Sequence, residues 1–375
     1  MLKICIWMNI PSHYQSAFFD ALDSRHDVDL RVVYFRGISQ DRAAEGWSGE
    51  HAYKSFESVV DDGTSPEGMV KTVSDWEHRV HIISGYFSSK LIDYFCKNKI
   101  RWCHWSEMSG VRLAELLKYN MSLFRLLNPL VLYAKRTEGL RIRKYAVGAF
   151  GQGDLARRSF RLMGVPDSKI DDLFYVPAAL AETTPSIQVV EFAAGRKVFL
   201  SVGALCKRKG IDVLLKAFAR QNASDWCVVL CGLDRADRIY QALAKKLGIE
   251  KQVLFLGAYP SKRINEVYSG ADVFVLPSRF DGWGAVENEA ASLGLPIIGT
   301  DLCGASMHVI VEGINGFRVK AGNVASLANA LKAYIQTPPR IVAHGQASRD
   351  RFYECFTPGH NAERFVESLA AWSCR

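Results

Sequence analysis

Residues 271–300 have the sequence "ADVFVLPSRFDGWGAVENEAASLGLPIIGT". An apolar run over residues 273–276 predicts a buried strand, and the residues from Ala285 onward predict a helix. Between them lies a loop that holds Asp281 and the two glycines Gly282 and Gly284. In an open α/β sheet, ligands bind in the loops that follow the carboxyl ends of parallel strands. This loop is therefore a candidate ligand site.

The acids and glycines of the loop allow two interpretations. Glycines let a backbone approach a ligand closely, and the amino terminus of a helix suits a phosphate. Glu289 is then placed to accept hydrogen bonds from ribose hydroxyls, and Asp281 from a second polyol. Alternatively, Asp281 caps the turn, while Glu287 and Glu289 face solvent near the positive end of the helix dipole.

A second loop with different chemistry lies upstream, in "SVGALCKRKGIDVLL", residues 201–215. Lys209 directly precedes Gly210 at the expected start of a helix, where a cation and the helix amino terminus can together hold a diphosphate. A basic turn on the surface is the alternative. One cationic loop and one loop rich in glycine and carboxylates together favour a nucleoside diphosphate that carries a sugar.

Short apolar runs alternate with helical patterns along the whole chain, which is typical of parallel βα units. The expected strands include "KICIWMNI", "VDLRVVYF", "HRVHII" and "KIRWCHW" in the first half, and "RKVFLSVGAL", "WCVVLCG" and "KQVLFLGAY" in the second. We expect an α/β protein with two doubly wound, Rossmann-like parallel sheets that face a central cleft. Small and polar residues over 180–195 indicate a linker between domains 1–180 and 181–357, with a last helix over 358–375.

The order of these motifs resembles the donor-binding domain of the retaining GT-B glycosyltransferases of family 4, also described as glycosyl transferases group 1. That family carries an acid, seven residues and a Glu, which Asp281 and Glu289 match. "YSGADVFVLPS", "GLPIIGT" and "EGINGFRV" match as well, so the resemblance is close over residues 198–335. The first half matches loosely, through "NIPSHYQSAFFDAL" and "GDLARRSFRLMGVPDSKI".

The resemblance implies transfer of a sugar, with retention, from a nucleotide-sugar donor in the second domain to an acceptor on the side of the first. It also implies that the last helix crosses back to the first domain. Glu289 would bind the ribose, Lys209 would neutralise the diphosphate, and Asp281 would meet the donor sugar. The resemblance implies that the segment Gly257–Tyr259 would line the base. The amides of Gly282, Trp283, Gly284 and Ala285 would meet the donor sugar and the distal phosphate, and Gly203 is a further donor contact. Such a transfer needs no protein nucleophile, metal or other cofactor.

This sequence departs from the family pattern at two positions. The first acid is Asp281 rather than the commoner Glu, which shortens its reach by one methylene group. Ala204 stands where the family usually has Arg, directly after the glycine that Gly203 matches. We expect Arg208 or Lys207 to supply the missing cation for the diphosphate.

The first domain offers weaker candidates in the loops after its expected strands. His104, in "RWCHWSEMSG", is a candidate for orienting the acceptor or the donor sugar from across the cleft, and Glu107 lies just beyond it. A histidine among aromatic residues can equally be structural. Asn9 and His13, after the first strand, are candidate acceptor contacts.

The net charge of +8 is concentrated in residues 111–145, where eight Lys and Arg residues face two Glu residues. Leucines at helical spacing make this segment amphipathic, and such a surface can bind anionic lipid headgroups. Helices that pack in the core and turn a basic face to solvent are the alternative. The first interpretation favours a glycan or lipid-linked acceptor in the assembly of cell-envelope polysaccharide. No motif for nucleic acid accompanies the charge.

Several other sites and activities find no support in the sequence. Asp27 and Asp29 form a DxD pattern without partner ligands, no Cys/His cluster has zinc spacing, and no GxGxxG follows the first strand. Nine scattered cysteines favour a reducing compartment. We expect a cytoplasmic protein, with peripheral attachment to the inner face of the membrane as an option. The rival functions are a nucleotide-sugar epimerase or hydrolase on the same fold, and a non-catalytic nucleotide-binding scaffold.

Overall fold

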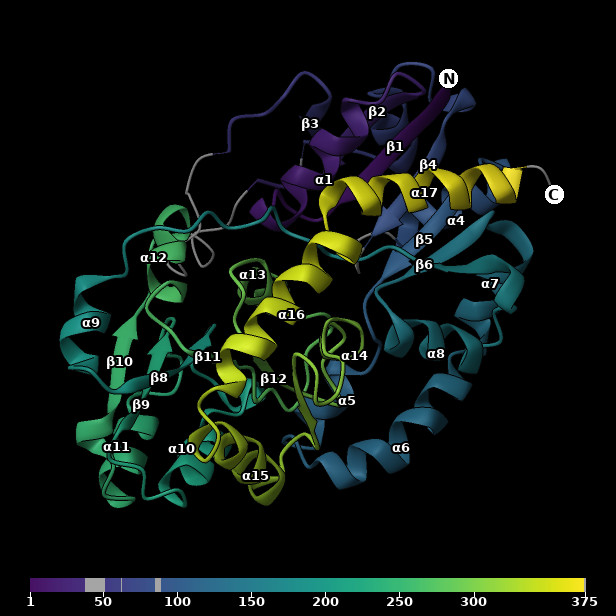
Figure 1. Ribbon diagram of the computed structural model, residues 1–375. Coiled ribbons are helices and arrows are strands. Elements are labelled where there is room, and N and C mark those ends of the chain that lie inside the picture. Colours follow the sequence, from purple (N-terminus) through teal and green to yellow (C-terminus); the bar gives the residue numbers. More distant parts are fainter. Residues whose placement is uncertain (38–50, 62, 85–88, 374–375) are drawn as a thin grey trace.

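The computed structural model describes residues 1–37, 51–61, 63–84 and 89–373. Two parallel sheets form the centres of two domains (Figure 1). The first sheet has the order β3-β2-β1-β4-β5-β6-β7 and the second the order β10-β9-β8-β11-β12-β13. The predicted fold class, two Rossmann-like α/β domains, is confirmed.

The strands of the first sheet are β1 (Leu2–Met8), β2 (Val28–Tyr34), β3 (Glu57–Val59), β4 (Val80–Ser84), β5 (Trp102–Ser106), β6 (Gly148–Gly151) and β7 (Ile170–Asp172). The second sheet contains β8 (Lys197–Val202), β9 (Trp226–Cys231), β10 (Val253–Gly257), β11 (Val273–Val275), β12 (Ile297–Thr300) and β13 (Gly316–Val319). Every residue of β9 is buried, because helices cover both faces of a doubly wound sheet.

Both faces of the first sheet carry a core. In β1, Ile4 and Ile6 pack on the face that also buries Phe18, while Cys5 and Trp7 pack on the opposite face. The alternation follows from the two-residue period of a strand. The helices of this domain are α1 (His13–Asp23), α3 (Pro66–Lys71), α4 (Ser89–Asn98), α5 (Val111–Leu116), α6 (Met121–Ala134), α7 (Arg136–Tyr145) and α8 (Asp154–Leu162).

The remaining helices belong to the second half of the chain. They are α9 (Ile187–Ala193), α10 (Ile211–Ala219), α11 (Ile239–Lys246), α12 (Ile264–Tyr268), α13 (Val286–Ser292), α14 (Ser306–Val309), α15 (Val324–Ile335), α16 (Arg340–Cys355) and α17 (Pro358–Ser373). Helix α17 lies on the first domain beside α1, where the Phe18 and Phe365 rings are 5.7 Å apart (Figure 1). The chain thus returns to its first domain at the end.

The segment between the domains differs from the expected linker. Part of residues 180–195 forms α9, whose Val189 and Ala193 are buried in the core of the second domain. Pro185 precedes the helix and does not interrupt it. Phe174, on the first-domain side of the expected boundary, packs in the same core. Burial of these apolar side chains orders a stretch whose composition alone indicated a loop.

The two domains also share a small apolar cluster. Phe124 of α6 meets Phe280 of the second domain edge to face, with the ring centroids 5.5 Å apart. Beside this contact, Arg125 donates to the Asp301 carboxylate at 2.7 Å. The other buried members of the cluster are Met108, Ala114, Met121, Leu302 and Ala321. The basic segment therefore takes part in the contact between the domains.

Candidate functional site

A cavity of about 1020 Å³ lies between the two domains. Its walls are the loops that follow the carboxyl ends of β1, β5, β8 and β11, where open α/β sheets bind ligands. The two loops predicted to bind a ligand, around Lys209 and Asp281, lie side by side in its second-domain wall. The pattern of strands and helices therefore located the cavity correctly.

Lys209 and Asp281 form an ion pair in the cavity wall. The Lys209 Nζ atom donates to Asp281 Oδ2 at 2.6 Å, and the Ser278 hydroxyl donates to the same oxygen at 3.3 Å. Burial opposes the charge of Asp281, but Lys209 and Arg208 outweigh burial and lower the pKa of the carboxyl. The aspartate is therefore ionised at neutral pH.

Gly203 gives Lys209 the room that this position needs. A Cβ atom at residue 203 would lie 3.2 Å from Lys209 Cε, and the backbone of Gly203 has a φ of +134°. Both the close approach and the dihedral angle favour glycine.

Arg208, not Lys207, is the second cation at the cavity. An Arg208 guanidinium nitrogen lies 3.4 Å from Asp281 Oδ1 and donates to the Phe280 carbonyl. The side chain of Lys207 is exposed, and the residue does not line the cavity. Of the two candidates for the cation missing at Ala204, only Arg208 is placed to serve.

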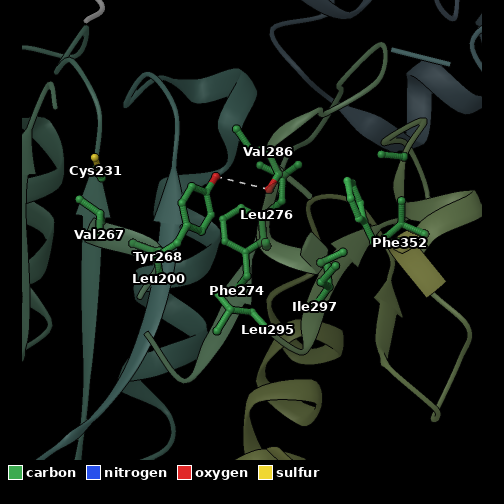
Figure 2. Close-up of a cluster of buried hydrophobic side chains, with 14 of the residues drawn as sticks. Leu200, Cys231, Val267, Tyr268, Phe274, Leu276, Val286, Leu295, Ile297 and Phe352 are labelled. Carbon is green, nitrogen blue, oxygen red and sulfur yellow. Dashed lines mark hydrogen bonds between the residues drawn. The ribbon is translucent and has the colours of Figure 1, made fainter. Parts of the chain in front are cut away.

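Glu289 lies in the cavity wall and is 4% exposed. The Tyr268 hydroxyl donates to Glu289 Oε2 at 2.7 Å and lies 3.3 Å from the Val286 carbonyl oxygen, the contact drawn in Figure 2. Burial raises the pKa of Glu289 to about 7, and the bond from Tyr268 works against that shift. Glu287 is fully buried as well. The alternative in which both glutamates face solvent is therefore wrong.

The backbone of the loop between the acids is tightly enclosed. A Cβ atom at Gly282 would lie 1.7 Å from Glu107 Oε2, and one at Gly284 would lie 2.6 Å from Cys303 Sγ. Gly284 also has a φ of +95°. Any larger residue at either position would displace the loop.

The indole of Trp283 is buried in the core of the second domain. It stacks on Phe174 with the ring centroids 5.1 Å apart, donates to Asn288 at 3.1 Å and is 2% exposed. Trp283 was expected among the donor contacts. Its indole is occupied by packing, so its backbone is the part that remains for a ligand, together with Ala285, which lines the cavity.

The expected base-binding segment lines the cavity only in part. Tyr259 lines the cavity and donates its hydroxyl to Glu266 at 2.7 Å. Gly257 does not line the cavity, and its carbonyl accepts the amide of Gly232 at 2.7 Å. Gly232 and Leu233, which no motif marked, line the cavity in its place.

The first-domain wall contains each of the weaker candidates. His104 of β5, Glu107, Asn9 and His13 all line the cavity. The His104 ring meets Phe160 edge to face, and burial lowers the pKa of His104 to about 4, so the imidazole is neutral. The wall also holds two carboxamides that carry no signal in the sequence, Gln15 and Gln152.

The structure offers no site for a metal within the residues that it describes. No group of three or more His, Cys, Asp or Glu side chains in these ranges could hold an ion. Asp27 pairs with Arg25 and Asp29 with Arg79, so the DxD pattern serves ion pairs. Across the described residues, no helix combines the length and the apolar character that crossing a membrane requires.

Part of the chain is similar to a known protein family and to known sequences. Residues 183–351 match the family described as glycosyl transferases group 1. A D-inositol 3-phosphate glycosyltransferase from Corynebacterium aurimucosum is 30% identical over 188 residues, 48% of this chain and 44% of the relative. The D-inositol 3-phosphate glycosyltransferase from Nocardia farcinica is 32% identical over 196 residues, which cover 48% of this chain and 41% of the relative. These matches support a group 1 glycosyltransferase. The chain spans less than half the length of these curated relatives.

Solved structures extend the likeness to the whole fold. HepE from Anabaena, in complex with UDP, superposes with a TM-score of 0.73 at 16% identity, over 98% of this chain and 100% of that chain. Sucrose-phosphate synthase from Thermosynechococcus elongatus gives 0.71 at 16% identity, over 98% of both chains. The fold is GT-B, as the resemblance of the motifs implied.

Proposed function

We propose that this chain is a retaining glycosyltransferase that takes its sugar from a nucleoside diphosphate sugar bound in the cavity between the domains. The observation that carries the proposal is the arrangement of Lys209, Asp281 and Glu289 in one cavity, on loops or helices that follow β8 and β11. A cation, an ionised acid and a buried acid there match the diphosphate, sugar and ribose of such a donor. HepE, whose complexes contain UDP and UDP-glucose, makes uridine the first base to test.

Each of these residues has a task that follows from its charge. Lys209 and Arg208 stabilise the charge that develops on the departing diphosphate, which is the main barrier to be lowered. Asp281, ionised and bonded to Lys209, accepts from hydroxyls of the donor sugar. Glu289 accepts from the ribose hydroxyls through the carboxylate that Tyr268 orients. No nucleophile on the protein is assigned.

The acceptor binds from the first domain. Neutral His104 can donate or accept a hydrogen bond, and the carboxamides Gln15 and Gln152 are suited to hydroxyl groups. We propose a glycan or a lipid-linked sugar as the acceptor. The D-inositol 3-phosphate named for the curated relatives is the soluble compound to test beside it.

The experiment measures nucleotide release from UDP-, GDP- and ADP-sugars, with and without D-inositol 3-phosphate or a lipid-linked monosaccharide. Release that depends on an acceptor is expected, and Lys209→Ala should abolish it. Lys246→Ala, at an exposed position outside the cavity, is the matched control. Release of nucleotide without any acceptor would favour a hydrolase. Interconversion of the sugar would favour an epimerase, and binding of the nucleotide sugar without turnover would favour a non-catalytic scaffold.

The helices α5–α7 support a further part of the proposal, contact with an anionic membrane. Their outer surface exposes Leu116, Leu123, Leu126, Leu130, Tyr133 and Leu140. The same helices carry exposed cations, namely Arg112, Lys118, Arg125, Arg136, Arg141, Arg143 and Lys144, of which Arg125 and Arg141 pair with Asp301 and Asp93. Exposed apolar side chains on a strongly basic segment suit the headgroup region of an anionic bilayer.

Vesicle sedimentation tests the membrane contact. Binding to vesicles of phosphatidylcholine with phosphatidylglycerol is expected, with little binding to phosphatidylcholine alone. Replacing Leu126 and Leu130 by Ser should weaken vesicle binding severalfold, whereas Val342→Ser, at an exposed apolar position on α16, should not. Equal sedimentation of both variants with the wild type would overturn this part.

A further inference from the structure

A buried acid that the proposed function does not use lies directly beneath the donor loop. Glu287 of α13 has no exposed surface. Its Oε1 atom accepts a hydrogen bond from the Ser306 hydroxyl at 2.6 Å. Its Oε2 atom is buried and has no hydrogen-bond partner among the described residues. One oxygen of this carboxyl is therefore satisfied and the other is not.

The surrounding residues leave a specific space for the carboxyl. A Cβ atom on Gly299 of β12 would lie 2.2 Å from Ser306 Oγ and 2.4 Å from Glu287 Oε1. Any side chain at residue 299 would occupy the place of this hydrogen-bonded pair. Gly299 thus leaves the space that the carboxyl and the hydroxyl fill.

The same segment holds the donor loop, defined here as residues 281–284. The Asp281 amide donates to the Leu302 carbonyl at 2.9 Å, and the Ala305 amide donates to the Trp283 carbonyl at 2.7 Å. The Cys303 thiol donates to that Trp283 carbonyl as well, at 2.9 Å. Ser306 follows directly in the chain. Its bond to Glu287 therefore ties the helix after the donor loop to the segment that holds the loop.

A negative charge on Glu287 would be poorly compensated. Burial is the main cause that raises the pKa of Glu287 to about 8, and the Asp281 carboxylate adds to it. Ser306, Cys303 and Lys209 act in the opposite direction, but Lys209 is already bonded to Asp281. An ionised and unpartnered oxygen in such surroundings is costly.

Helix α16, which packs against α13, does not supply the missing cation. Its Arg351 donates to the His308 carbonyl at 3.1 Å. Its Arg349 pairs with Glu182. Neither guanidinium group bonds to Glu287. On α14, which also packs against α13, burial lowers the pKa of His308 to about 4, so this imidazole adds no positive charge.

We propose that Glu287 is a positioning residue: its carboxyl fixes the donor loop through Ser306, and a negative charge on its buried, unpartnered Oε2 atom disturbs the packing beneath the loop and weakens donor binding. This inference rests on the proposed function, because it concerns the same donor site. It predicts an alkaline limit on donor affinity that is set by a residue outside contact with the donor.

The stability of the ligand-free protein should also depend on pH, in a defined direction. The carboxyl is protonated in the folded state up to about pH 8 but loses its proton near pH 4 in the unfolded chain. Between these values the folded state holds the extra proton, so raising the pH lowers the stability. Above about pH 8 both states are ionised and this contribution no longer changes.

The experiment is a calorimetric titration with UDP, GDP and ADP at pH 7 and pH 9. For the nucleotide that binds, the wild-type affinity should fall about 10-fold, as expected for a group titrating near pH 8. Glu287→Gln should bind as the wild type does at pH 7 and lose less than about 2-fold at pH 9. Glu250→Gln, at an exposed position outside the cavity, is the matched control and should follow the wild type.

Two outcomes would overturn the inference: a wild-type affinity that does not fall at pH 9, or the same fall in Glu287→Gln. If Glu287→Gln does not fold, Glu287→Met, which cannot ionise, takes its place; because it lacks the oxygen that accepts from Ser306, it should bind more weakly at both pH values but show no further fall at pH 9. A ligand-free measurement separates this inference from the proposed function. The thermal midpoint of the wild type should fall relative to that of the neutral variant between pH 5.5 and pH 8. Parallel midpoints would overturn the inference, and absence of binding by every nucleotide would contradict the proposed function instead.

Discussion

The ammonium group of Lys209 lies 2.6 Å from the carboxylate of Asp281, although their loops follow different strands, β8 and β11. The two side chains are only 12% and 13% exposed. A donor diphosphate must share Lys209 with Asp281 or displace it. The ion pair is therefore both a support for the cavity wall and a competitor of the donor, and changes to its two members should have different effects.

Lys209→Ala should weaken the affinity for a nucleoside diphosphate by ~2 kcal/mol or more, because it removes a charged contact and leaves Asp281 with Arg208 as its remaining cation. Calorimetric titration with UDP, GDP and ADP measures this loss. Lys246→Ala is the control. An unchanged affinity would mean that Lys209 only stabilises the cavity wall and does not contact the diphosphate.

Asp281→Asn should separate binding from transfer. Removing the charge releases Lys209 toward the diphosphate, so we expect unchanged or tighter binding of the nucleoside diphosphate alone. Transfer from the nucleotide sugar should fall by about 100-fold, since a contact to the donor sugar is lost. Titration and turnover assays on one preparation test both, with the exposed Asp167→Asn as the control. Parallel losses of binding and transfer would contradict this assignment.

The buried carboxyl of Glu289 should determine how the affinity for the nucleotide changes between pH 6 and pH 8. Because burial raises the pKa of Glu289 to about 7, the carboxyl is partly protonated at neutral pH. Ribose hydroxyls donate best to the carboxylate, so binding should release protons and the affinity should rise from pH 6 to pH 8. Calorimetry at pH 7 in buffers of different ionisation enthalpy measures the release. Glu289→Gln should abolish it, and a release that persists in this variant would exclude Glu289 as its source.

The contact between the domains predicts unequal effects of two neighbouring residues. Phe280 is 2% exposed and packs on Phe124, so Phe280→Ala should destabilise the protein by ~3 kcal/mol and increase the radius of gyration. The Arg125–Asp301 pair is one-third exposed, so Arg125→Ala should cost less than ~1 kcal/mol. Denaturant unfolding and small-angle scattering measure both quantities. Equal losses would contradict this prediction, because they would show that the exposed ion pair contributes as much to stability as the buried aromatic contact.

The strands and their connecting loops could be predicted because parallel strands are buried on both faces. That burial appears in the sequence as short apolar runs such as β9 and β11. Once those runs were located, the rule that ligands bind beyond their carboxyl ends placed Lys209, Asp281 and Glu289 in the cavity. Local composition carries this information, so one sequence sufficed.

The partners of these residues could not be predicted in the same way. Lys209 meets Asp281 at a separation of 72 residues, and Tyr268 meets Glu289 at a separation of 21 residues. No local pattern determines such pairs, because they depend on the order of strands within the sheet. The burial of Glu287 was missed for a related reason: an acid early in a helix ordinarily faces solvent, and the space beside Gly299 appears only in three dimensions.

Binding of a sugar nucleotide in the cavity can be tested by a thermal-shift panel of UDP-, GDP- and ADP-sugars on the wild type and on Glu289→Ala. Binding to the folded state alone stabilises by ~2.7 kcal/mol at 100 times the dissociation constant, so one class of sugar nucleotide should raise the wild-type midpoint by several degrees. Glu289→Ala, compared with its own ligand-free midpoint, should lose the shift, whereas Glu250→Ala should keep it. An equal shift in Glu289→Ala, or no shift of the wild type with any sugar nucleotide, would contradict the account.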